Sequence, residues 1–237
     1  MQIGQVYQGP PDSANGGYAC GLFVQQAAQS LGTGMPFAVQ LHAPPPLQTE
    51  LTIKRTSRRV HVWSGQGIVA TVTPDATEVE LLPPATQQAA EVASRGFAGR
   101  SFHPFPTCAI CGSGRTDQAA LRLSPGPLAG RKGTVACTWM PCSAVSAELM
   151  WAVLDCPGGW TLDQVPAPWV LSRMTARIAA YPVPGETTVA VARGELQGER
   201  RARCLSALYR TNGTELGRAL ATWSRLSPAN NIGDIAL

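Results

Sequence analysis

Two stretches of the chain are apolar nearly throughout, and short strand-like runs surround them. The two stretches, residues 18–31 and 146–156, predict helices that are buried on most sides. The pattern elsewhere predicts strands at residues 37–42, 50–54, 59–63, 67–73, 133–139, 174–179, 187–192, 201–209 and 216–223. Because helices do not alternate with strands, this order indicates antiparallel sheets rather than a βαβ fold.

The same order of elements occurs twice. Each copy has a helix, an extended run, a proline-rich corner and a strand that begins beside a glutamate, Glu50 in one copy and Glu186 in the other. We therefore predict an α+β fold of two tandem halves, residues 1–82 and 133–237, each a curved antiparallel sheet wrapped around one long central helix. Residues 83–132, with a short helical piece at 85–93, form the linker and entry segment. Chance similarity of two α+β halves is the alternative.

Composition and charge exclude several classes of protein. Hydrophobic residues make up 44% of the 237 residues and charged residues 14%, which is typical of a well-packed globular chain. The net charge of +4 is small and its basic residues are scattered, so we expect no nucleic-acid partner, although an anionic cofactor tail would suit it. No apolar run is long enough to span a membrane and the start lacks a signal-peptide pattern, so we expect a cytoplasmic protein.

Seven cysteines form an odd set, and without a secretory signal a disulfide framework is not expected. Cys108 and Cys111 form a C-x-x-C pair, with Cys137 and Cys142 further along. Zinc needs two more ligands at compatible spacing, and Cys137 lies within a predicted strand. We therefore predict structural thiols and no metal site, with metal binding and redox activity as the alternatives.

The second helix carries two carboxylates, Glu148 and Asp155, seven residues apart and so on one face. A carboxylate on a buried helix is costly unless it is paired or used, and burial raises its pKa toward values useful for a general base. Asp155 has structural alternatives: it can bond the turn that follows or pair with Arg173 or Arg177. Glu148 lies in the first turn, where an acid suits the helix dipole.

Asn15, Gly16 and Gly17 open the first helix. Two glycines allow a ligand to approach bare backbone N–H groups, and a helix N-terminus stabilises developing negative charge. Such a loop can hold the oxyanion of a carbonyl under attack. The alternative is that Asn15 is an N-cap and the glycines form a turn.

These features resemble the hotdog thioesterases, particularly the phenylacetyl-CoA thioesterase-like group. There a His-Gly-Gly-type loop opens the central helix, and an acid follows nine positions after the His. Asn15-Gly16-Gly17 matches the loop with Asn for His, but position 24 is Val. Asp155 matches the acid, but Ser146 stands nine positions before it without glycines. Because hotdog dimers place the site between two subunits, the resemblance implies a fused pair with one complete site between its halves.

The resemblance further implies hydrolysis of an acyl-CoA thioester. Asp155 would activate water or attack directly, while the Gly16 and Gly17 amides hold the carbonyl oxygen. The implied site residues are Asn15, Gly16, Gly17 and Asp155 for catalysis, and Tyr18, Ser146 and Trp151 for substrate binding. No cofactor is implied beyond the coenzyme A of the substrate. Two chains are expected to associate through their sheets as a homodimer of four hotdogs.

Two other readings follow from what the motifs lack. The missing His favours, as an alternative, an acyl-CoA or fatty-acyl binding protein on a degenerate hotdog scaffold. It also weakens an acyl dehydratase, which relies on a catalytic His facing an acid. Cys156 stands beside Asp155, but no His lies near it by pattern, so we interpret it as structural. The tryptophans at 139, 151 and 160 are expected either to line an acyl tunnel or to form core.

Overall fold

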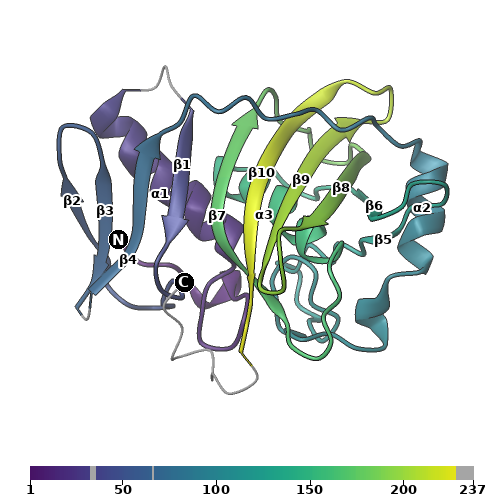
Figure 1. The fold of residues 1–237 in the computed structure, drawn as a ribbon. Coiled ribbons are helices and arrows are strands. Elements are labelled where there is room, and N and C mark those ends of the chain that lie inside the picture. Colours follow the sequence, from purple (N-terminus) through teal and green to yellow (C-terminus); the bar gives the residue numbers. More distant parts are fainter. Residues whose placement is uncertain (33–35, 66, 228–237) are drawn as a thin grey trace.

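A computed structural model describes residues 1–32, 36–65 and 67–227. Its main feature is one antiparallel sheet in the order β2-β3-β4-β1-β7-β10-β9-β8-β6-β5 (Figure 1). The strands are β1 (Phe37–Leu41), β2 (Thr52–Arg55), β3 (Val60–Ser64), β4 (Gly67–Pro74), β5 (Gly126–Pro127), β6 (Thr134–Trp139), β7 (Trp169–Ile178), β8 (Thr188–Leu196), β9 (Arg201–Arg210) and β10 (Glu215–Arg225). The helices are α1 (Gly16–Leu31), α2 (Gln87–Arg95) and α3 (Ala147–Gly159), with short 3₁₀ turns η1 (Gln5–Tyr7) and η2 (Ala98–Arg100).

The predicted helices and strands are all present, with shifted ends. The largest shifts are at the start of β7, which begins at Trp169 rather than at residue 174, and at the end of β8, which continues to Leu196 rather than ending at residue 192. The prediction that α3 ends at residue 156 was wrong, because the helix continues through Pro157 to Gly159. Pro157 has no N–H, so the helix loses one intrahelical bond in its last turn. The two glycines after it leave room for the Trp223 side chain, which a Cβ on Gly159 would meet at 2.7 Å.

Helices α1 and α3 pack against each other on one face of the sheet (Figure 1). Two glycines of α1 permit this close approach. A Cβ on Gly17 would lie 2.7 Å from the Trp151 carbonyl oxygen, and a Cβ on Gly21 would lie 2.7 Å from the Cα of Glu148. The two helices therefore meet almost backbone to backbone, which brings the start of α1 to the last turns of α3.

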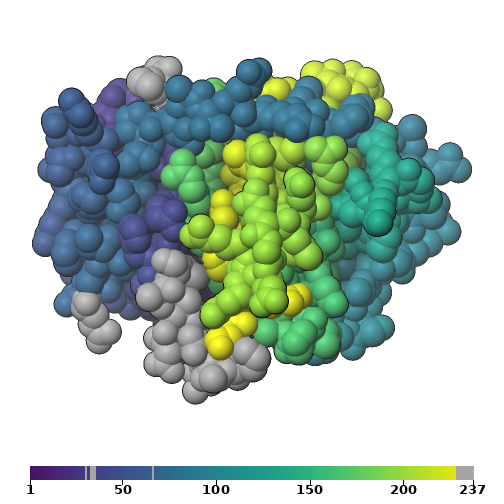
Figure 2. All heavy atoms as spheres, in the orientation of Figure 1, coloured from purple at the N-terminus to yellow at the C-terminus, as the bar shows by residue number. Residues whose placement is uncertain are grey.

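The opposite face of the sheet is covered where β6, β8 and β9 lie. After β4 the chain crosses the sheet to α2, as the blue band along the upper edge of Figure 2 shows. Val79 and Leu82 from this crossing, with Ala90 and Ala93 from α2, form a second apolar cluster. Their partners on the sheet are Ala136, Val189, Val191, Leu205, Ala207 and Tyr209.

Strands β1 and β7 join the two sets of strands at the middle of the sheet. Val39 lies opposite Met174 in this antiparallel pair. Just beyond β4, the Asp75 carboxylate accepts hydrogen bonds from Arg173 at 3.0 Å and from the Thr175 hydroxyl at 2.7 Å. The joint therefore combines backbone pairing with a charged contact between segments 100 residues apart in sequence. None of the helices in the described ranges combines the length and apolar character needed to cross a bilayer.

Candidate active site

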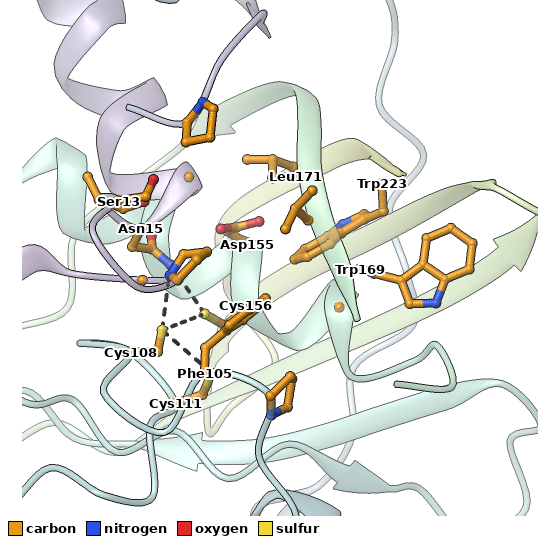
Figure 3. Close-up of a pocket in the computed structure, with 18 of the residues that line it drawn as sticks. Ser13, Asn15, Phe105, Cys108, Cys111, Asp155, Cys156, Trp169, Leu171 and Trp223 are labelled. Atoms are coloured by element: carbon orange, nitrogen blue, oxygen red, sulfur yellow. Dashed lines mark hydrogen bonds between the residues drawn. The ribbon is translucent and has the colours of Figure 1, made fainter. Parts of the chain in front are cut away.

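A cavity opens where the start of α1 meets the end of α3, beside the segment at residues 103–111 (Figure 3). It holds about 760 Å³, part of it open to solvent. Its wall is mainly apolar and aromatic: Leu41, Phe105, Trp160, Trp169, Val170, Leu171 and Trp223 contribute. The polar members include Ser13, Asn15, His103, Asp155 and Gln164. The cavity is therefore suited to an apolar group with a polar end.

Asp155 supplies the carboxylate in this wall, and it is only 2% exposed. Its Oδ2 accepts a hydrogen bond of 2.8 Å from the Gly17 amide, and its Oδ1 has no partner in the described part of the chain. Burial raises the pKa of Asp155 to about 7, although the Gly17 N–H and the Asn15 side chain oppose the shift. Arg173 and Arg177 bond Asp75 and the Thr77 carbonyl instead. Neither arginine pairs with Asp155, so the carboxylate keeps one oxygen free.

The N-terminus of α1 supplies backbone donors beside that carboxylate. Asn15 caps the helix, because its Oδ1 accepts from the Tyr18 amide at 2.9 Å and its carbonyl accepts from the Ala19 amide. The Gly17 amide is taken by Asp155. The Gly16 amide has no partner among the described residues, and Gly16 borders the cavity. The predicted cap is thus present together with one backbone N–H that is left for a ligand.

The structure brings one group of the predicted site residues together and places another group elsewhere. The Gly17 amide bonds Asp155, and Asn15 and Asp155 line the same cavity, as expected for a shared site. Tyr18, Ser146 and Trp151 do not line the cavity. The Tyr18 ring stacks on Tyr7 with 3.7 Å between centroids, the Ser146 side chain caps α3 by accepting from the Leu149 amide, and Trp151 is buried against Gly21. These three side chains are therefore absent from the site described above.

The aromatic wall was largely missed by sequence reasoning. Of the tryptophans expected at an acyl tunnel, only Trp160 lines the cavity, while Trp139 and Trp151 belong to the core. Trp169 and Trp223 come from β7 and β10, which pair side by side. Their contribution depends on strand pairing between distant segments, and no local motif marks it.

Three cysteines converge at the floor of the cavity. The Cys108 Sγ lies 3.8 Å from the Cys111 Sγ and 3.9 Å from the Cys156 Sγ (Figure 3). The Asn15 Nδ2 lies 3.4 Å from the Cys156 Sγ and 3.9 Å from the Cys108 Sγ. Hydrogen bonds from Cys111 and Cys156 hold the pKa of Cys108 well below its usual range. Cys156, which the sequence predicts to be structural, lies beside Cys108, a residue 48 positions away in sequence.

His103, which no sequence pattern connects with Cys156, lines the same cavity. Both of its ring nitrogens are engaged: Nδ1 accepts from the Phe105 amide at 3.0 Å, and Nε2 therefore donates to the Cys111 carbonyl at 3.1 Å. Burial lowers the pKa of His103. A neutral ring with both nitrogens occupied is poorly placed to accept a proton from a thiol.

Comparison with known proteins identifies the fold of the chain but not its family. No family model matches the chain, and no curated protein matches it either. Among solved structures, a candidate thioesterase from Novosphingobium aromaticivorans superposes with a TM-score of 0.60 at 13% identity, over 96% of this chain and 94% of that one. A hot dog fold protein of unknown function from Alicyclobacillus acidocaldarius gives 0.57 at 15% identity, over 96% and 92%. An acyl-CoA thioesterase II from Mycobacterium marinum gives 0.55 at 11% identity, over 90% of both chains.

These matches extend over nearly the whole length of both chains, whereas the identities are too low to carry residue roles across. Together with the antiparallel sheet and the helices packed on its face, they establish the architecture. The chain has the hotdog fold that these solved proteins share.

Proposed function

We propose that this protein hydrolyses an acyl-CoA or related acyl thioester, with Asp155 as the catalytic acid or base. One observation carries the proposal: a buried carboxylate with one free oxygen lines a mainly apolar cavity beside a free backbone amide. A buried charge that is not fully paired lowers the stability of a fold, so its presence at a cavity points to a functional role. The solved proteins of similar fold include enzymes described as thioesterases, which supports the same chemistry.

The free oxygen of Asp155 would accept a proton from water as that water attacks the thioester carbonyl; direct attack by the carboxylate is the variant of this step. The Gly17 amide anchors the other oxygen and so fixes the carboxylate's direction. The Gly16 amide at the positive end of α1 would stabilise the oxyanion. The Gly17 amide, expected earlier as an oxyanion donor, takes the anchoring role instead.

The acyl group would occupy the aromatic side of the cavity. Trp169, Leu171 and Trp223 line that side, next to Asp155 (Figure 3). The tandem arrangement accounts for the single site: the loop comes from residues 1–82 and the acid from residues 133–237, while the position on α1 that would hold a second acid is Val24. We retain the homodimer as part of the proposal. It would have to use the part of the outer sheet face that α2 and the crossing segment leave uncovered.

The test is release of free thiol from a panel of acyl-CoA esters of increasing chain length. We expect Asp155→Asn to lower kcat by about 10²–10⁴-fold, the usual contribution of a general base, while circular dichroism stays unchanged. Glu148→Gln is the matched control, because Glu148 is a buried acid of the same helix that does not line the cavity. Full activity of Asp155→Asn would refute the assignment.

The alternative is an acyl-CoA binding protein without hydrolysis, and Asn15 in place of the motif's His favours it. Calorimetric binding of acyl-CoA esters by the wild-type protein, combined with no thiol release across the whole panel, would establish this second function instead.

A further inference from the structure

The sulfur atoms of Cys108, Cys111 and Cys156 form a compact triangle. All three lie within 4.8 Å of one another, and the edges from Cys108 to Cys111 and to Cys156 measure 3.8 and 3.9 Å. A zinc ion with bonds of about 2.3 Å to each sulfur requires tetrahedral edges of about 3.8 Å. A disulfide requires a sulfur–sulfur distance of about 2.05 Å. The triangle therefore has the dimensions of a metal site in the reduced protein.

The surroundings of the triangle supply hydrogen-bond donors to its sulfur atoms. The backbone N–H groups of Ile110 and Cys111 donate to the Cys108 Sγ, and the Asn15 amide approaches two of the three sulfurs. Such outer hydrogen bonds are typical of metal-bound sulfur. Gly112 closes the turn after the pair: its amide bonds the Cys108 carbonyl at 2.9 Å, and a Cβ there would strike the Pro106 carbonyl oxygen at 2.5 Å.

We propose that Cys108, Cys111 and Cys156 bind one thiophilic metal ion, Zn²⁺ in the first instance, at the floor of the cavity. Three sulfur ligands select soft ions over Mg²⁺ or Ca²⁺. The edges are too short for an iron–sulfur cluster, whose ligands must span several metal atoms. Among the described residues, only these three His, Cys, Asp or Glu side chains gather at such spacing. Because all three line the cavity, the fourth ligand comes from the cavity side, as water or an incoming group.

The ion would tie residues 108–111 to the last turns of α3. That link closes the cavity wall directly beside Asp155, which precedes Cys156 in the chain. Metal binding needs no substrate, so this inference stands or falls independently of the proposed hydrolysis.

The experiment uses the full-length protein, purified reduced and without chelator. We expect about one zinc per chain by elemental analysis, and after removal of zinc we expect Co²⁺ to give sulfur-to-cobalt charge-transfer bands and the visible spectrum of a four-coordinate ion. Cys108→Ala, Cys111→Ala and Cys156→Ala should each weaken Co²⁺ binding by more than about 100-fold, beyond the effect of losing an outer hydrogen bond. Cys137→Ala, a buried thiol outside the triangle, is the matched control.

Wild-type protein that binds neither ion and shows no charge-transfer band overturns the proposal, whatever the variants do. So does unchanged Co²⁺ binding in Cys156→Ala. Formation of a disulfide within the triangle under hydrogen peroxide, in protein that takes up no metal when reduced, would assign the thiols to redox chemistry instead.

Discussion

At the scale of single residues, the missing side chains of Gly17 and Gly21 matter as much as the Asp155 carboxylate. Gly17 allows the Asp155 carboxylate to reach its backbone amide, and Gly21 allows α1 to lie against the Cα of Glu148. Sequence analysis singled out Gly17 through its motif. It did not find Gly21, because an isolated glycine in a helix carries no signal without knowledge of the helix it faces.

We expect Gly21→Ala to lower the free energy of unfolding by about 1–2 kcal/mol. Overpacking usually costs about 1–3 kcal/mol, and the higher helix propensity of alanine returns up to about 1 kcal/mol. Urea unfolding followed by circular dichroism measures the change. Gly65→Ala is the control, since a Cβ there meets no atom within 4 Å. Equal stability of Gly21→Ala and wild type would mean that α1 and α3 lie further apart than described.

At the scale of elements, the sequence pattern located most strands and both central helices, but not what holds them together. The alternation of residues 187–192, for example, predicts β8 and its two apolar faces. It does not say that residues 79–93 cover one of those faces. The triangle of cysteines was hidden for the same reason: Cys156 comes from α3 and its partners from a turn, so no spacing rule connects them.

The contact of Asp75 with Arg173 and Thr175 predicts a pH-dependent joint between β4 and β7. Burial by itself raises the pKa of Asp75, but hydrogen bonds from Thr77 and Thr175 and the charge of Arg173 lower it overall. A carboxyl with a depressed folded pKa stabilises above its unfolded pKa, and this stabilisation is lost as the pH falls through the folded value. Asp75→Asn should therefore lose about 1 kcal/mol at neutral pH and much less at a pH below the lowered pKa of Asp75.

Urea unfolding at both pH values checks this expectation, with Glu50→Gln as an exposed control that should change stability at neither. If Asp75→Asn lowers the free energy of unfolding equally at both pH values, the shape of the side chain, rather than its charge, stabilises this contact.

At the scale of the whole molecule, one core serves both sets of strands. The larger apolar cluster contains Phe23 and Val39 from the first part of the chain and Leu154, Met174 and Trp223 from the second. Neither part can bury its share of this cluster without the other, so the two are expected to unfold together despite their separate positions in sequence.

Calorimetry of the full chain should show a single transition whose van't Hoff and calorimetric enthalpies agree. Gly21→Ala should move that whole transition to lower temperature rather than split it. Two resolved transitions, only one of them shifted by Gly21→Ala, would contradict the shared core.

The distribution of the thiols also allows a fluorescent label to be attached at a defined position. Six of the seven cysteines are buried, and Cys142 is exposed. It lies five residues before α3 begins at Ala147, at the opposite end of that helix from Asp155. A maleimide dye added under native conditions should therefore attach at a single position, without mutagenesis. Its emission would then report in real time whether α3 shifts when an acyl ester or a metal ion arrives.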